Sequence, residues 1–185
     1  GPTGSHLRTY READLTPVLS SEEQVELWAR TPRGACALHF DTGMNRLGLA
    51  SSVLTHRRDE LHKLQPVLVM SHLACADDPD SLMNAQQRDS FAALRRRYPD
   101  ALASFANSGG CFLGSDYGFD AVRPGISLWG GGPEGRSDPR IQPVATFSAP
   151  ILQVRPVPVG ESVGYARGKV ADQPLTVATV GAGYA

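Results

Sequence analysis

Short apolar runs and longer amphipathic stretches alternate through the first 130 residues. The apolar runs lie at 15–19, 35–40, 66–70, 101–106 and 121–123. The run at 66–70 is apolar throughout, which is typical of a strand buried on both faces of a parallel sheet. Runs of this length, roughly 20 to 36 residues apart with helical stretches between them, predict successive β/α units.

Helical signals fill the intervals between these runs. Ser20 stands three residues before Glu23 and Ser21 three residues before Gln24. Both have the spacing of a capping box and predict a helix that ends near Arg30. The stretch after residue 50 is helical in composition, and its Arg57 is expected to face solvent. A longer helix is expected from Ser81 onward. The sequence therefore predicts an α/β fold with about five β/α units, fewer than the eight of a complete (β/α)8 TIM barrel.

The pattern changes after residue 130. Residues 131–143 are rich in glycine, proline and charge, which indicates a linker. Beyond them the chain shows strand-like segments punctuated by proline and glycine, without helical periodicity. We therefore expect a partial barrel domain at 1–130, a linker at 131–143 and the beginning of a C-terminal β-rich domain at 144–185.

Composition narrows the classes of partner. The formal net charge of −1 gives no electrostatic reason to expect binding to nucleic acid or to a membrane surface. No apolar run approaches the roughly 18 residues that span a bilayer. Cys36, Cys75 and Cys111 form an odd set in or beside apolar segments, so we expect buried thiols and a cytoplasmic protein.

Polar side chains follow the strand-like runs where each run ends. Arg46 lies in a glycine turn after the second run, and His72 follows the third. Loops after parallel strands are where α/β folds bind ligands. A guanidinium can bind a carboxylate or a phosphate through two parallel hydrogen bonds. On local grounds alone, Arg46 also fits a surface arginine and His72 a core histidine.

A phosphate site is predicted after the fourth and fifth runs. Asn107 and Ser108 precede a glycine pair, and Gly125 and Ile126 follow the fifth run. A hydroxyl and free backbone N–H groups at the start of a short helix can surround an anion. The alternative is that these glycines only form turns. Arg123 ends the fifth run and needs an acceptor, because an unpaired cation in an apolar setting is costly.

Six segments resemble the alanine racemases, a family of enzymes that use pyridoxal phosphate (PLP), in the family's order. They are Asp-Thr-Gly-Met-Asn-Arg-Leu-Gly at 41–48, Ser-His-Leu-Ala-Cys-Ala-Asp at 71–77, Phe-Ala-Asn-Ser-Gly at 105–109, Val-Arg-Pro-Gly-Ile at 122–126, Val-Gly-Tyr at 163–165 and Gly-Tyr-Ala at 183–185. The resemblance extends over nearly the whole chain. It implies that the five β/α units are the C-terminal units of a TIM barrel, followed by the start of the family's β-rich domain.

The resemblance also implies a cofactor site. Asn107, Ser108 and the backbone of Gly125 and Ile126 would hold the PLP phosphate, and Arg123 would face the pyridine nitrogen. Because arginine does not readily give up a proton, the ring nitrogen would stay unprotonated and PLP would be a weaker electron sink. That would limit side reactions such as transamination.

Further roles are implied for the substrate and for the proton transfers. Arg46 would lie beside the substrate carboxylate, and His72 would link Arg123 to a catalytic tyrosine. That tyrosine would be Tyr165, one of two bases on opposite faces of the substrate, contributed by the second subunit of a head-to-tail homodimer. On the residues alone, Tyr165 is predicted to be a strand tyrosine. Asp77 and Tyr184 would line the substrate entrance, although Asp77 also fits a surface helix cap.

Two departures from the family pattern stand out. Many relatives carry a carbamylated lysine where this chain has His39, so another group or a bound anion would have to hold Arg46. The family's cofactor lysine lies in a segment that nothing here matches, and neither Lys63 nor Lys169 has suitable surroundings. We therefore expect a central fragment that lacks about three barrel units and most of the second domain, and that does not racemise alanine alone.

The leading functional prediction is a bacterial alanine racemase. It would interconvert L-alanine and D-alanine by PLP-dependent two-base proton transfer and supply D-alanine for peptidoglycan in the cell wall. No metal site is predicted. The alternatives are a broad-specificity amino-acid racemase and a non-catalytic PLP-binding barrel protein. A carrier would need the phosphate site but not the second base, so the combination of Arg46, Arg123 and Tyr165 favours an enzyme.

Overall fold

A computed structural model describes residues 1–30 and 34–183 of the 185-residue chain. The chain divides into two compact units, Gly1–Val144 and Ala145–Ala185, which are described separately below. Within the described residues, no helix is both long enough and apolar enough to cross a membrane.

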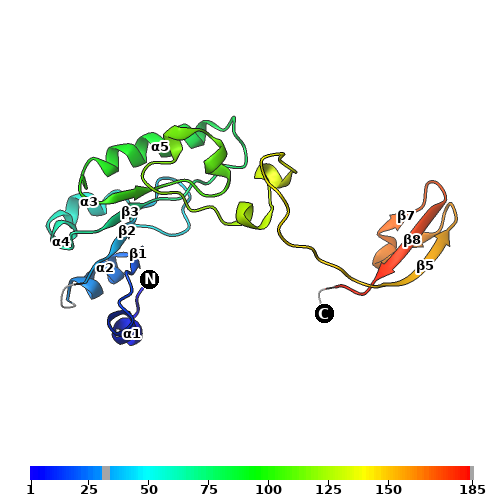
Figure 1. Cartoon of the computed structure of the whole chain (residues 1–185), viewed down its shortest axis with the longest axis horizontal. Coiled ribbons are helices and arrows are strands. Elements are labelled where there is room, and N and C mark those ends of the chain that lie inside the picture. The colour runs from blue at the N-terminus through cyan, green and yellow to red at the C-terminus, as the bar shows by residue number, and fades with distance from the viewer. Residues whose placement is uncertain (31–33, 184–185) are drawn as a thin grey trace. The chain divides into compact units, whose positions relative to one another are not determined.

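The first unit is built on a parallel sheet whose strands are ordered β1-β2-β3-β4 (Figure 1). The strands are β1 (Val18–Leu19), β2 (Ala37–His39), β3 (Leu68–Met70) and β4 (Leu102–Ser104). Consecutive strands are neighbours, as in a β/α barrel. The fifth predicted strand is reduced to one parallel bridge between Ser104 and Ala121, supported by the Arg123 N–H, which donates to Ala106 O at 2.9 Å. The prediction of part of a parallel α/β barrel followed by a β-rich region is confirmed.

Helices and 3-10 turns connect these strands. They are η1 (Gly4–His6), α1 (Leu7–Glu12), α2 (Glu22–Ala29), α3 (Val53–His56), α4 (Arg58–Lys63), α5 (Leu82–Arg95), η2 (Gly109–Phe112), η3 (Ser115–Tyr117), η4 (Ile126–Trp129) and η5 (Pro133–Gly135). Ser21 caps α2 as its spacing predicts, because its Oγ accepts a hydrogen bond from Gln24 N at 3.4 Å. The helical stretch after residue 50 is split into α3 and α4 at Arg57.

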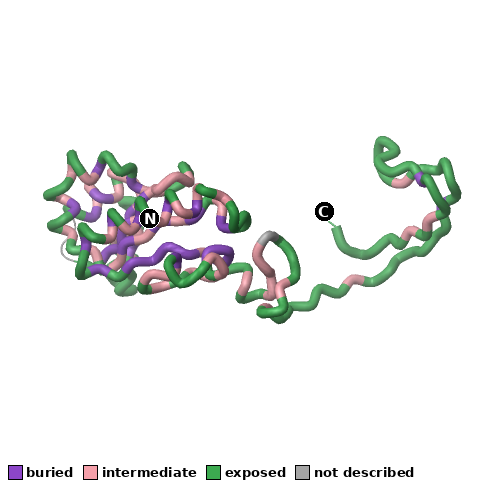
Figure 2. Tube along the Cα trace, turned by 90° about the horizontal axis from the view of Figure 1, so that it is seen from above, coloured by how far each residue is buried: buried purple, intermediate pink, exposed green. Residues whose placement is uncertain are grey.

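The core lies between the sheet and its helices, and Figure 2 shows its buried residues concentrated along the strands. Phe91 of α5 stacks on Phe105 with ring centroids 5.0 Å apart, and both side chains are fully buried. Only one of the three thiols follows the sequence expectation. Cys36 is buried, Cys75 is half-buried and Cys111 is exposed, because η2 turns Cys111 outward and its Sγ donates to Asn107 O.

The expectation that Arg57 faces solvent is wrong, although its neighbours His56 and Arg58 are exposed. The Arg57 guanidinium donates to Glu22 of α2 and to Glu60 of α4, both at 2.7 Å, and also to Glu26 of α2. The side chain is 22% exposed. Three carboxylates from two helices therefore hold one guanidinium, a pairing that local sequence cannot reveal.

This network predicts a pH-dependent loss of stability. Hydrogen bonds from His56, and next from Arg57, hold the pKa of Glu22 below its usual value. A carboxylate with a lowered pKa stabilises the fold above its unfolded pKa, and this contribution is lost as the pH falls through the folded pKa. We expect Arg57→Met to lower the urea midpoint at pH 7 and to reduce the further loss between pH 7 and pH 3. Arg58→Met, at an exposed neighbour, is the control, and equal midpoints for both variants would contradict the prediction.

The second unit contains two antiparallel strand pairs. They are β5 (Ile151–Val157) with β8 (Leu175–Val180), and β6 (Ser162–Val163) with β7 (Lys169–Val170). A 3-10 turn, η6 (Tyr165–Arg167), follows β6. The prediction that Tyr165 lies in a strand is therefore wrong. Gly164 adopts a φ of +83° and turns the chain out of β6 directly before the tyrosine.

Candidate active site

Several polar residues of the first unit gather at the carboxyl edge of the parallel sheet. His39 ends β2, Ser71 and His72 follow β3, Ser104 ends β4, and Arg123 follows the Ser104–Ala121 bridge. The carboxyl ends of parallel strands meet at one edge, which places these side chains at a common mouth.

Arg123 is the centre of this cluster. Its Nη1 donates to Ser104 Oγ at 2.6 Å, and its Nη2 donates to Ser71 O at 2.6 Å. Nη2 also lies 3.3 Å from Nδ1 of His72. Burial lowers the pKa of Arg123, yet a guanidinium in a protein keeps its proton. The strands thus fix a permanent positive charge at the edge of the sheet.

The contact with Arg123 defines the state of His72. A guanidinium can only donate, so Nδ1 of His72 accepts and the neutral ring carries its proton on Nε2. Burial lowers the pKa of His72, and the charges of Arg123 and Arg46 lower it further. His72 is therefore neutral near pH 7 and has an N–H available for another acceptor.

A set of converging donors lies around Ser108. Its Oγ accepts hydrogen bonds from Gly125 N at 2.7 Å and from Ser127 N at 3.3 Å. Ser127 Oγ is buried and has no hydrogen-bond partner in the structure. Two backbone N–H groups that converge on the Ser108 hydroxyl suit an anion with several oxygens, such as a phosphate. Asn107 has a structural role, because its Oδ1 accepts from Gly110 N at 2.9 Å.

These residues fit the two ends of PLP. The Ser108 cluster has the donor chemistry that a phosphate needs, and Ser127, whose N–H donates to Ser108 Oγ, keeps a buried hydroxyl without a partner. Arg123 is a fixed cation that can only donate hydrogen bonds, which suits a ring nitrogen that accepts one. Ile126, in η4, is exposed beside the cluster, and the second backbone donor to Ser108 is Ser127.

Arg46 sits on a closed loop between Phe40 and Leu49. These two residues form a parallel bridge, and Asp41 Oδ1 accepts from Gly43 N at 2.7 Å and from Met44 N at 2.8 Å. The loop therefore has a defined shape and presents Arg46 with an exposed side chain. Its charge is near enough to the sheet edge to lower the pKa of both His72 and His39.

The shape of this loop depends on Gly48. Its φ is +130°, and a Cβ there would lie 2.6 Å from the backbone nitrogen of Asp41. We expect Gly48→Ala to lower the free energy of unfolding by about 1–3 kcal/mol, because strain and a backbone clash add together. Gly114→Ala is the matched control, since Gly114 has a φ of +116° but open space around it. Chemical denaturation of both variants checks this, and equal losses would contradict a role for the clash.

His39 occupies the edge of the site nearest β1. Its Nδ1 lies 3.3 Å from Ser20 Oγ. Burial lowers the pKa of His39, followed by the charges of Arg123 and His72, with Asp41 acting in the opposite direction. The imidazole of His39 is therefore neutral near pH 7 and can act as a hydrogen-bond acceptor.

Sequence reasoning missed the buried polar residues beneath the site, above all Gln87 of α5. Gln87, Thr42, Ser71 and Ser104 form hydrogen bonds among themselves or to the site residues. One signal could have found Gln87. It stands at the same helical face as Phe91 and Leu94, where an apolar residue is the usual choice.

Three further residues are predicted to belong to the site. Tyr165 belongs to the second unit, and its side chain is 96% exposed. Asp77 is exposed in the loop before α5. Tyr184 lies outside the described residues. The structure thus brings Arg123, His72 and Ser104 into direct contact.

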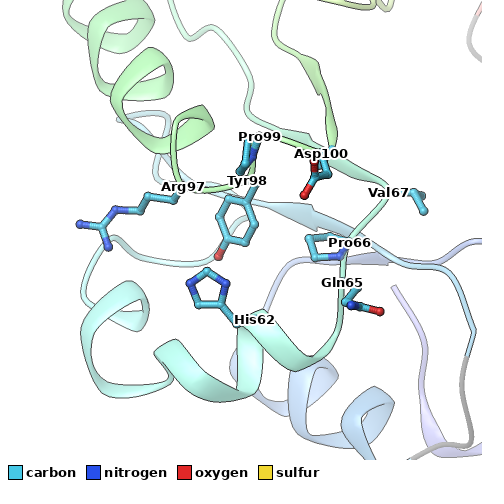
Figure 3. Close-up of a pocket in the computed structure, with 9 residues that line it drawn as sticks. His62, Gln65, Pro66, Val67, Arg97, Tyr98, Pro99 and Asp100 are labelled. Atoms are coloured by element: carbon cyan, nitrogen blue, oxygen red, sulfur yellow. The ribbon is translucent and has the colours of Figure 1, made fainter.

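A pocket of about 580 Å³ lies at the opposite edge of the sheet. Figure 3 shows the rings of His62 and Tyr98 facing each other there, with Pro66 and Asp100 beside the amino ends of β3 and β4. Burial raises the pKa of Tyr98 to about 12, so this phenol keeps its proton near neutral pH. Barrel enzymes carry their chemistry at the other edge.

Comparison with known proteins gives a consistent result. The family model of the alanine racemase N-terminal domain matches residues 1–133, and that of the alanine racemase C-terminal domain matches 144–185. An alanine racemase of Rhodospirillum rubrum is 46% identical over 94% of this chain and 49% of its own length. One of Rhizobium meliloti is 44% identical over 94% of this chain and 48% of its own.

Solved structures agree. The biosynthetic alanine racemase of Pseudomonas aeruginosa superposes with a TM-score of 0.83 at 29% identity, covering 99% of this chain and 53% of that protein. The alanine racemase of Bartonella henselae, with covalently bound pyridoxal phosphate, gives 0.75 at 31% identity, covering 97% and 52%. The chain thus spans about half the length of the relatives that it matches.

Proposed function

Because the chain belongs to the alanine racemase family, we propose that the protein containing it interconverts L-alanine and D-alanine with pyridoxal phosphate. One observation carries the proposal. A permanently charged Arg123, held by Ser71 and Ser104, contacts a neutral His72 at the sheet edge that also carries the Ser108 phosphate cluster. A phosphate carrier would not need the arginine–histidine pair.

Cofactor binding is assigned to Ser108, Gly125, Ser127 and Arg123. Asn107 shapes the turn that presents Ser108, and Ile126 begins the short helix η4 beside it. When bound, PLP withdraws electrons from the substrate α-carbon and so makes its hydrogen acidic. Arg123 presents N–H groups that donate hydrogen bonds and does not readily give up a proton, so it would leave the pyridine nitrogen unprotonated.

Proton transfer is assigned to Tyr165 with His72 behind it. The Nε2–H of His72 can donate to the phenolic oxygen and stabilise its deprotonated form, which is the form that accepts a proton. Racemisation needs a base on each face of the α-carbon, because the proton leaves one side and returns on the other. The family assigns the second base to the cofactor lysine, and Lys63 of α4 and Lys169 of β7 do not match that segment.

Arg46 is assigned to the substrate carboxylate. A guanidinium on a well-defined loop offers two parallel donors, which suit a carboxylate. His39 stands where many relatives have a carbamylated lysine and is a neutral acceptor rather than an anion. Asp77 and Tyr184 are assigned to the substrate entrance.

The complete protein is proposed to be a cytoplasmic homodimer that supplies D-alanine for bacterial peptidoglycan. An exposed phenol in the second unit, at Tyr165, is available to a partner subunit. The proposed domain boundaries are 1–130 for the barrel portion, 131–143 for the linker and 144–185 for the start of the β domain.

The test is an assay of a full-length protein that contains this chain. With PLP present, D-alanine should form from L-alanine and the reverse reaction should reach the same equilibrium, as measured by chiral chromatography. Parallel assays with serine and lysine distinguish an alanine racemase from a broader enzyme. A PLP-loaded protein that leaves L-alanine unchanged would overturn the proposal.

A further inference from the structure

We propose that Gln87 is a positioning residue that couples the loop carrying Arg46 to the segment carrying His72. The hydrogen-bond network on which this depends stands by itself, whereas its effect on catalysis rests on the proposed racemase function. Gln87 acts through the two loops that its hydrogen bonds join, one carrying Arg46 and the other carrying His72.

The side-chain amide of Gln87 is fully used. Its Oε1 accepts a hydrogen bond from Ala74 N at 2.9 Å. Its Nε2 donates to His72 O at 3.0 Å and to Thr42 Oγ1 at 3.3 Å. The residue is 0% exposed, so its amide depends on these three hydrogen bonds and has no contact with solvent.

The network continues from Gln87 to the centre of the site. Thr42 Oγ1 lies 2.7 Å from Ser71 Oγ, and Ser71 O accepts the 2.6 Å hydrogen bond from Arg123. Thr42 belongs to the loop of Arg46, whereas Ser71 and His72 follow β3. A single glutamine on α5 therefore fixes the relative positions of two loops that come from different strands.

The chemistry of position 87 supports a role beyond packing. Phe91 and Leu94 lie on the same buried face of α5, and an apolar residue at 87 would fill the core at no cost in polar burial. An amide is useful there because its oxygen accepts a hydrogen bond from the segment after β3, and its N–H groups donate to that segment and to the loop of Arg46. His72 is then held at two points, its carbonyl by Gln87 and its ring by Arg123.

Gln87→Met tests the proposal in a full-length racemase containing this chain. Methionine has a similar length and volume but makes none of the three hydrogen bonds. We expect kcat to fall about 100-fold, because displacement of reacting groups by about 1 Å has an effect of that size. The absorbance of bound PLP should persist, since the hydrogen bonds of Gln87 go to Ala74, His72 and Thr42 and not to Ser108 or Gly125. The neighbouring Gln86→Met is the matched control, because Gln86 is exposed on the same helix, and its kcat should not change.

Hydrogen–deuterium exchange gives a readout that does not depend on turnover. In Gln87→Met, peptides spanning 42–48 and 71–74 should exchange faster, whereas peptides spanning 107–112 should not. Unchanged exchange in both loops would overturn the proposal. If the wild-type protein does not racemise alanine but the exchange result holds, the proposed function fails while the coupling stands.

A double-mutant cycle separates positioning from general destabilisation. Thr42→Val removes the hydroxyl that Gln87 and Ser71 share, and should also lower kcat. Because both substitutions break one network, the losses in log kcat should not add in the double variant, whereas independent effects would add. Additive losses, or full kcat in folded Gln87→Met, would overturn the proposal. If Gln87→Met does not fold, Thr42→Val decides the question, and an unchanged kcat would then count against coupling.

Discussion

Replacing Tyr165 with phenylalanine in the full-length protein is expected to lower kcat for alanine racemisation about 1,000-fold while PLP stays bound. A positioned acid–base group commonly contributes about 10²–10⁴-fold, and the substitution removes only the hydroxyl. Tyr165 is almost fully exposed in the second unit, so its hydroxyl has little to contribute to folding. The measurement is the rate of D-alanine formation together with the absorbance of the bound cofactor.

Isotope exchange makes this expectation specific to one base. With one base removed, the α-hydrogen of one enantiomer of alanine should still exchange with deuterated solvent, whereas that of the other should exchange far more slowly. Tyr10→Phe is the control, because Tyr10 is a half-buried tyrosine of α1 that packs edge-on against Trp28. Full racemase activity in Tyr165→Phe, or equal exchange of both enantiomers, would contradict the role given to Tyr165.

The order of strands and helices could be predicted because each depends on local patterns. The apolar run at 66–70 became β3, and the capping signal at Ser21 became the start of α2. The ends of the elements were less well determined. The run at 121–123 forms only a bridge, because Pro124 cannot donate to a ladder and the chain turns away at Gly125.

The site could be predicted only where its residues follow a strand. Ser108 and Arg123 were found because the ends of parallel strands meet at one edge, a rule that needs no long-range information. The contacts of Gln87 were missed because its partners lie 13 to 45 residues away in the sequence. Those of Arg57 were missed because Glu22 and Glu26 lie 35 and 31 residues away, and only Glu60 is near in sequence. Hydrogen bonds of this kind depend on how helices pack against strands and leave no local periodicity.

Arg123→Met should lower kcat by about 10²–10³-fold, because removing one preorganised donor from an active site has effects of this size. It should also destabilise the fold, since Ser104 Oγ is buried and would lose its guanidinium partner, at about 1–3 kcal/mol. Thermal unfolding should therefore be measured beside activity, so that kcat is compared only at temperatures where the variant is folded.

The pH profile distinguishes this electrostatic role from a structural one. Burial, and next the positive charge of Arg123, hold the pKa of His72 below its usual value. Without that charge the pKa of His72 should rise, and His72 would be protonated over a wider range of acidic pH. Because the proposal makes neutral His72 the functional form, the acidic limb of kcat/KM should move to higher pH.

Arg95→Met provides the control for this shift. Arg95 lies at the carboxyl end of α5 and also donates to a carbonyl, at Pro99, but on the opposite edge of the sheet. Its loss should affect stability without moving the pH profile. If Arg123→Met left the acidic limb in place, the charge of Arg123 would not govern His72, and the proposed path from arginine through histidine to the catalytic phenol would have to be abandoned.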